Sequence, residues 1–190
     1  MSPNTIQTES VKRGLIIVLV VGCSLGVWKV VRERGQGAPS FTTVEEFIGF
    51  ASQSAVTDAK TYDHINLDYS ADSLKQVDEI LGRVHDEYVK NPSSIHLRGL
   101  ASEYGAYVGE VIRRSQPNVY WTRDSKVMGE KAYALHWKVG ESYPFTWCAE
   151  RITNGQEDSV WIKYTVLNDP SWKQHLSGIV VRSKRVTPRQ

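Results

Sequence analysis

The chain has 190 residues, with 23 lysines and arginines against 21 aspartates and glutamates, which gives a formal net charge of +2. This near balance excludes the clearly basic domain or stripe that nucleic-acid binding requires, so we expect no nucleic-acid partner. The composition from residue 41 to residue 190 is that of one globular domain with its own core, and we expect no second full domain.

Two cysteines, Cys23 and Cys148, lie far apart, so the expected domain cannot close a disulfide within itself. A cysteine-rich zinc site needs several thiolates or Cys/His pairs at short spacing, and the five histidines are scattered. His64 lies close to Asp63 and Asp68, but one histidine between carboxylates in a loop more often belongs to a capped turn. We therefore expect no metal and no cofactor.

The first feature along the chain is an apolar stretch at residues 14–31, in which Lys29 is the one charged residue. About 18 residues at a rise of ~1.5 Å lie at the short end of what crosses a ~30 Å hydrocarbon core. The stretch predicts a transmembrane helix. It follows a tail at 1–13 and precedes a linker at 32–40 that combines charge, glycine and proline.

A second interpretation of this stretch stays open. Lys12 and Arg13, the apolar run after them and the sequence VVGC resemble the signal and lipobox of bacterial lipoproteins, which makes Cys23 a lipidation candidate. In both interpretations the membrane is a partner, through residues 14–31. A short tail before a single early apolar segment is typical of signal anchors and favours a domain outside the cytoplasm.

The spacing of apolar residues after the linker predicts helices. The first, within 42–55, begins with a capping-box pattern from Thr43 to Glu46. The second, within 68–92, carries apolar residues that recur at three and four, and Pro92 ends it.

A third helix is predicted within 93–114, and it contains Gly105 and Gly109. Each glycine costs about 1 kcal/mol relative to alanine in a helix interior, so we expect both to allow the close approach of another element. A membrane-dimer motif is excluded, because charged residues of the same helix would then lie in lipid.

Beyond residue 117 the hydrophobic period changes from helical to alternating. Runs rich in aromatic and β-branched residues predict strands at 118–122, 131–139, 143–152, 158–167 and 178–183. Gly140 to Ser142 and Thr153 to Asp158 predict hairpin connections. The expected fold is α+β, with three N-terminal helices packed on one antiparallel meander sheet.

Three segments carry a resemblance to a known family: LDYSADSLKQVDEIL from Leu67, YGAYVGEVIRR from Tyr104 and YPFTWCAERITNGQEDSV from Tyr143. Together they resemble a bacterial domain family of unknown function, in which an acidic helix, a helix with the pattern Y-x-G-E-V-x-R and a short sheet follow in this order. The resemblance covers residues 67–167. It implies a bacterial source and an α+β domain, and it implies no catalytic residues.

Glu103 and Glu110 are seven residues apart and therefore lie on one side of the third predicted helix. Arg113 and Arg114 can pair with Glu110 at three and four, and a solvated ion pair is the ordinary outcome of that spacing. Partner binding is the functional alternative for these four charged residues.

Two further partner-binding candidates lie in the predicted sheet. His136 projects to the opposite side of its strand from Trp137, on a half-exposed face. Trp161 alternates away from the apolar residues of the run at 158–167, so either that strand is covered on both faces or Trp161 helps to form a binding patch.

The chain lacks a phosphate-binding glycine loop, a G-x-S-x-G elbow, an H-E-x-x-H motif and a C-x-x-C motif. It therefore predicts a membrane-anchored, non-catalytic protein-binding domain of the bacterial envelope, of which an immunity-type module is one form. The alternative is a membrane-tethered hydrolase that uses dispersed histidines and carboxylates. A deep pocket with His64 or His136 beside a buried carboxylate would favour the enzyme.

Overall fold

The computed structural model describes residues 40–169, except for residues 126, 130–131 and 138–139. The predicted membrane stretch with Cys23 and the predicted strand at 178–183 lie outside the described residues. Within the described part, α-helices and one small antiparallel sheet form an α+β arrangement. None of the helices in that part combines the length and the apolar character needed to cross a membrane.

The first helix, α1 (Val44–Asp58), begins at the predicted capping box. The Thr43 side chain accepts a hydrogen bond from the backbone N–H of Glu46, whose carboxylate accepts one from the backbone N–H of Thr43. A π-helical turn, η1 (Ala59–Asp63), follows α1 and ends at the exposed His64, which has a φ of 58°. His64 thus lies in a turn at a helix end.

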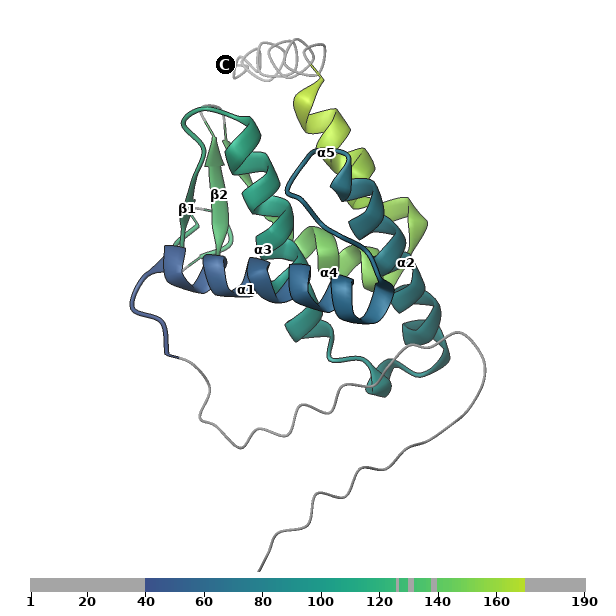
Figure 1. Ribbon diagram of the computed structural model, residues 1–190. Coiled ribbons are helices and arrows are strands. Elements are labelled where there is room, and N and C mark those ends of the chain that lie inside the picture. Colours follow the sequence, from purple (N-terminus) through teal and green to yellow (C-terminus); the bar gives the residue numbers. More distant parts are fainter. Residues whose placement is uncertain (1–39, 126, 130–131, 138–139, 170–190) are drawn as a thin grey trace, which may run out of the picture.

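The helices α2 (Ser73–Lys90) and α3 (Leu97–Ser115) confirm the second and third predicted helices, with a short 3-10 turn, η2 (Pro92–Ser94), between them. α3 lies at the centre of the domain, where α1 packs against it on one side and α4 on another (Figure 1). The predicted apolar positions that are buried are Leu74, Val77, Ile80 and Leu81 in α2, and Ala101, Tyr104, Val108, Val111 and Ile112 in α3.

The sheet contains β1 (Tyr120–Thr122), β2 (Ala134–Trp137) and β3 (Gly140–Ser142) in the antiparallel order β1-β2-β3. This confirms an antiparallel sheet after the helices, with β1 and β2 in the runs predicted at 118–122 and 131–139. Trp121 pairs with Leu135, and both side chains are buried. The prediction of a hairpin connection at Gly140 to Ser142 was wrong, because these residues pair with β2 as a third strand.

Gly109 allows β1 of the sheet to pack closely against α3. A Cβ atom on Gly109 would collide with the indole ring of Trp121, so only glycine lets β1 lie this close to the helix. This contact confirms the prediction that the glycines of α3 serve packing.

The predicted strands at 143–152 and 158–167 were wrong, because both runs are helical. The first forms α4 (Pro144–Asn154), which has proline in its first turn and buries Cys148, Arg151 and Ile152 at helical spacing. β-propensity is a weak preference that tertiary burial overrides, and the aromatic residues of this run hid its helical period.

The second run forms α5 (Val160–Asn168), whose N-terminus is capped by Ser159, which accepts a hydrogen bond from the backbone N–H of Ile162. Gly155, with a φ of 91°, ends α4, and a 3-10 turn, η3 (Gln156–Asp158), leads into α5. The expected hairpin at 153–158 is therefore a connection between two helices. α1 and α3 pack against β1, whereas α2 packs against α4 and α5. The α+β class is therefore confirmed, but the expectation of three helices packed on one sheet is met only in part, because the helices pack mainly on one another.

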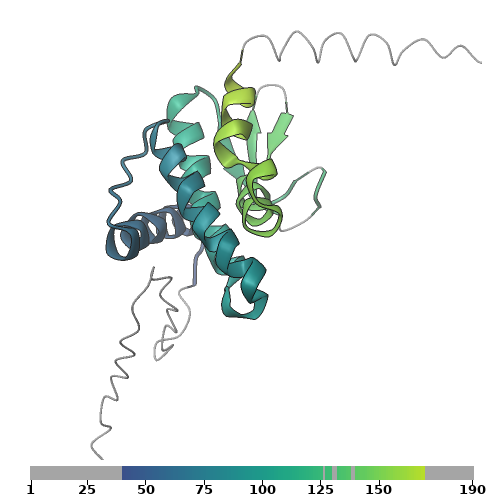
Figure 2. The same cartoon turned by 90° about the vertical axis from the view of Figure 1, so that its right-hand side faces the viewer.

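A buried polar link joins α2 to the last two helices, which lie beside it (Figure 2). The Asp78 carboxylate accepts a hydrogen bond from the backbone N–H of Val160 at 2.7 Å and lies 3.4 Å from Nε of Arg151. A Cβ on Gly82 would stand 2.6 Å from the Arg151 guanidinium, so glycine makes room for this arginine.

Candidate functional site

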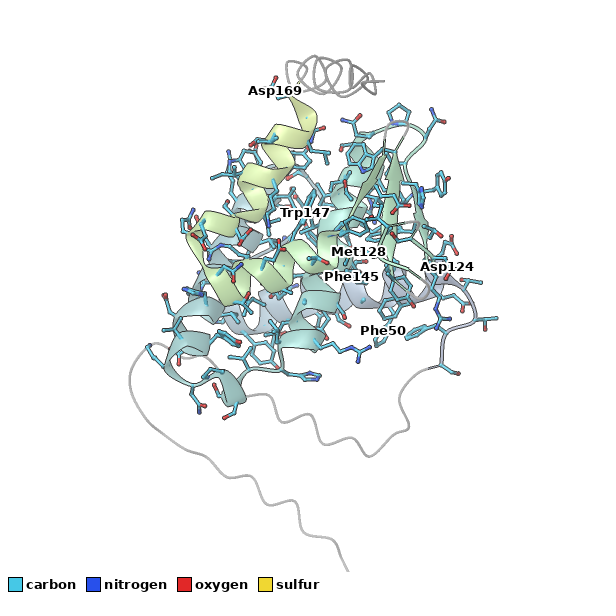
Figure 3. The ribbon with its side chains drawn as sticks, turned by 180° about the vertical axis from the view of Figure 1, so that it is seen from behind. Phe50, Asp124, Met128, Phe145, Trp147 and Asp169 are labelled. Carbon is cyan, nitrogen blue, oxygen red and sulfur yellow. The ribbon has the colours of Figure 1, made fainter. Side chains whose placement is uncertain are left out.

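A groove of about 900 Å³ opens between α1, α3, the start of α4 and the segment that leads into β2. We call it the aromatic groove, because its lining includes Phe47 from α1, Tyr133 before β2 and Phe145 from the first turn of α4. Figure 3 labels Met128, which also lines the groove, and Phe145.

The three rings form a compact aromatic cluster. Phe47 stacks on Tyr133 with ring centroids 4.9 Å apart, and Tyr133 lies 5.5 Å from Phe145. Phe145 also contacts Trp121 of β1 at 5.6 Å, which connects the cluster to the core. The rings are half-buried, so they offer apolar surface to a ligand while they remain held by the fold.

Phe145 reaches this position because α3 carries glycine opposite it. A Cβ on Gly105 would stand 2.6 Å from Cα and 2.8 Å from N of Phe145. Since these are backbone atoms, they cannot move aside as a flexible side chain can. Gly105 therefore sets the distance between α3 and α4 at Phe145, which lines the groove, as the sequence predicted for Gly105 and Gly109.

The charged residues of the groove are arginines. Arg98 comes from the first turn of α3 and Arg123 follows β1, and both are exposed. Among the described lining residues there is no aspartate or glutamate. Neither arginine takes part in any of the ion pairs found in the described part of the chain. The groove is thus apolar at its aromatic cluster and cationic where these arginines line it.

A hydrogen-bond network borders the groove. Tyr143, which lines it, donates a hydrogen bond to the Glu141 carboxylate at 2.6 Å, and the Ser125 hydroxyl donates to the same oxygen at 2.6 Å. Ser125 in turn accepts from the backbone N–H of Met128 at 2.9 Å. Burial and the Glu141 carboxylate raise the pKa of Tyr143. This network ties the segment that carries Met128 to β3.

His136 belongs to the same network, and it lies 3.3 Å from Glu141 through its Nε2 atom. Its ring stacks on that of Tyr120, with centroids 5.1 Å apart and nearly parallel planes. Ser125 and His136 contact different oxygens of the Glu141 carboxylate, the hydroxyl at Oε2 and the imidazole at Oε1. The aromatic groove is lined by neither His136 nor His64.

Glu110 makes the predicted ion pairs but in a different environment. Arg113 donates two hydrogen bonds to its carboxylate, at 2.7 and 2.8 Å, and Arg114 lies 3.6 Å away. The expectation of a solvated pair was wrong, because Glu110 is buried and also accepts a hydrogen bond from Nε1 of Trp121. Burial opposes its ionisation, but Arg113, Trp121 and Arg114 outweigh it and lower the pKa of Glu110.

Arg114 pairs with Glu110 and also packs against an aromatic ring. Its guanidinium lies 3.6 Å from the centroid of the Tyr69 ring, which itself stacks on Tyr107. The Tyr107 hydroxyl is 2.6 Å from the hydroxyl of Ser73 and accepts a hydrogen bond from the backbone N–H of Tyr69. Arg114 therefore covers a stacked pair that fixes the entry to α2.

A second, smaller cavity of about 290 Å³ lies between α1 and β1, and Glu110, Arg113 and Tyr120 help to line it. Tyr120 also stacks on His136, and Arg114 lies 3.6 Å from Glu110. The structure therefore brings four of the six predicted partner-binding candidates, Glu110, Arg113, Arg114 and His136, into one neighbourhood. Their polar groups already have partners within the domain: Glu110 accepts hydrogen bonds from Arg113 and Trp121, and His136 pairs with Glu141.

The other two predicted candidates lie elsewhere. Glu103 is half-buried on α3. Trp161 is half-buried on α5, where it stacks with Tyr164 at 5.8 Å and has the Lys75 ammonium 4.7 Å from its ring centroid. The tryptophan thus packs between α5 and α2, and the expected sheet-face patch around it does not form because the run is helical.

Sequence reasoning did not find Arg98, Arg123 or Phe145 as site residues. Each belongs to a different element, so no local spacing connects them, and Phe145 lay within a run predicted as a strand. The described residues contain no cluster of three or more histidine, cysteine, aspartate or glutamate side chains placed to hold a metal ion. No family model, curated protein or solved structure matches the chain.

Proposed function

We propose that this chain is a membrane-anchored, non-catalytic module of the bacterial envelope that binds a protein partner through the aromatic groove. The observation that carries the proposal is the groove itself, about 900 Å³ with a cluster of three half-buried rings. Binding sites are concave and mostly apolar with a few polar groups, and aromatic residues and arginine are enriched in protein interfaces.

The tether places the groove near the membrane in this proposal. Residues 14–31 hold the chain in the bilayer, and the nine linker residues at 32–40 span at most ~30 Å when fully extended. Phe41 directly follows the linker and contacts Phe47, a groove residue, with ring centroids 5.5 Å apart. The partner is therefore a protein that presents its binding segment close to the membrane surface, on the extracytoplasmic side.

Site-specific photocrosslinking in native membranes tests the groove. A photoreactive phenylalanine replaces Met128, which lines the groove, and in a matched protein it replaces Ile162 on α5. The two side chains are 55% and 53% exposed, so they sample solvent equally. We expect one protein adduct from position 128 that is absent at position 162 and is lost when Ser102→Trp fills the groove.

The adduct is identified by mass spectrometry and its partner is purified for direct binding. Equal adducts at both positions, or an adduct that persists in Ser102→Trp, would contradict the proposal. An adduct with a second copy of this chain would show that the groove is a contact between copies, and it would also contradict the proposal.

The intact mass of the chain from native membranes tests the anchor. A full-length mass without lipid corresponds to a retained transmembrane helix, and a mass that begins at Cys23 with acyl chains corresponds to a lipoprotein. Recovery of the chain in the soluble fraction would contradict membrane anchoring in both forms.

A further inference from the structure

The charge of the aromatic groove indicates the chemistry of its occupant. We infer that the groove selects a short peptide segment that combines apolar side chains with a carboxylate, and that Arg98 and Arg123 are the residues that determine this specificity. The inference rests on the proposed function, because it names the class of segment that the proposed partner presents.

The placement of the two arginines supports a carboxylate. They come from separate elements, α3 and the end of β1, and they line one groove that also holds the ring of Phe145. Apolar walls of low dielectric strengthen the field of charges within a cleft, and no described lining residue supplies a negative charge to balance it. Guanidinium groups match the geometry of a carboxylate through paired hydrogen bonds.

The hydroxyl groups of the groove support a peptide as the source of that carboxylate. Ser102 on α3, Tyr143 before α4 and Thr146 on α4 all line the groove. The Ser102 hydroxyl donates its proton to the Arg98 carbonyl, and the Tyr143 hydroxyl donates its proton to Glu141. The Ser102 oxygen can still accept a hydrogen bond from a backbone N–H of an extended peptide, which the hydrocarbon chain of a lipid lacks. The aromatic cluster then receives the apolar side chains of the segment.

A selection from a display library of random octapeptides tests the inference without knowledge of the partner. The bait is the full chain in nanodiscs of zwitterionic lipid, as wild type, as the double variant Arg98→Gln with Arg123→Gln, and as Ser102→Trp. A matched control, Lys60→Gln with Lys75→Gln, removes the same charge at exposed positions outside the groove.

We expect wild type and the lysine control to enrich peptides with aromatic or aliphatic residues next to aspartate or glutamate. The arginine variant should keep the apolar enrichment and lose the acidic one. For one selected peptide, an Asp→Asn change should weaken binding to wild type about tenfold and leave binding to the arginine variant nearly unchanged.

Three outcomes would overturn the inference. Groove-dependent peptides without an acidic excess, or an acidic excess that persists in the arginine variant, would refute it and leave the proposed function standing. Loss of peptide binding in nanodiscs that contain anionic lipid would show that lipid headgroups compete for Arg98 and Arg123, and it would assign these arginines to the membrane surface. Identical enrichment by wild type and Ser102→Trp would instead refute the proposed function, so the two failures are distinguishable.

Discussion

Gly105 on α3 lies so close to Phe145 at the start of α4 that a Cβ atom on the glycine would stand 2.6 Å from Cα of the phenylalanine. We expect Gly105→Ala to lower the free energy of unfolding by about 1–3 kcal/mol, because the added methyl group forces α4 away from α3. The displaced Phe145 should also weaken partner binding. Urea unfolding of the full chain in detergent micelles measures the first effect.

Gly49 on α1 provides the matched control. It is also in a helix interior, but a Cβ there would meet no atom within 4 Å. Gly49→Ala should therefore stabilise the fold by about 0.5–1 kcal/mol through helix propensity. Equal effects of the two substitutions would show that the contact between α3 and α4 does not determine the response.

Asp78 is expected to contribute strongly to stability. Its carboxylate is buried, pairs with Arg151 and caps the N-terminus of α5 at Val160. Asp78→Ala leaves the Arg151 charge buried without its partner, so we expect a loss of about 3–5 kcal/mol in the free energy of unfolding. Asp72→Ala, which breaks an exposed pair with Lys75, should cost less than about 1 kcal/mol in the same urea titration.

Glu110 should give the fold a pH dependence. Burial opposes ionisation, but the bonds from Arg113 and Trp121 lower the pKa of Glu110 below its ordinary value. A carboxyl with a lowered pKa in the folded state stabilises the fold above its unfolded pKa, and this contribution is lost as pH falls through the folded pKa. The stability advantage of wild type over Glu110→Gln should therefore be full above the ordinary pKa of glutamate and shrink as the pH falls below it.

Unfolding curves of both proteins at several pH values measure this advantage. Glu87→Gln, which removes an exposed pair with Lys90, is the control and should change stability by less than about 1 kcal/mol. A wild-type advantage over Glu110→Gln that stays constant or grows on acidification would contradict the assignment.

Cys148 should be protected from thiol reagents. The side chain is fully buried on α4, and burial raises its pKa, so little reactive thiolate forms. In a Cys23→Ser background, labelling with iodoacetamide at about pH 8 should proceed only as fast as the domain opens. Asp78→Ala should accelerate it by lowering the cost of opening, whereas Asp72→Ala should not. Rapid labelling of the folded parent would show that the α4 core is open.

The parts of the fold that sequence reasoning found depend on local signals. The capping box at Thr43 and Glu46 is recognisable from four consecutive residues. The packing role of Gly105 and Gly109 follows from two glycines within one helical segment. The helical state of α4 and α5 depends instead on burial, of α4 against α3 and α2 and of α5 against α2. The contact between Asp78 and Val160, which caps α5, joins residues 82 positions apart and has no local signature.

The candidate site was harder to predict for the same reason. The pairing of Glu110 with Arg113 follows from helical spacing, but its burial depends on the arrival of the Trp121 indole from β1. The aromatic groove assembles Phe47, Arg98 and other residues from separate elements, so it exists only in the folded chain. The sequence alone therefore did not show that these residues share one groove.

Binding of the crosslinked partner to the full chain in nanodiscs tests the central claim most directly. The comparison is between Ser102→Trp, which fills the groove, and Thr57→Trp on α1, where the threonine bonds to the carbonyl four residues earlier, as Ser102 does. We expect Ser102→Trp to weaken binding at least about tenfold and Thr57→Trp to match wild type. Equal affinities for all three proteins would show that the aromatic groove is not the binding site.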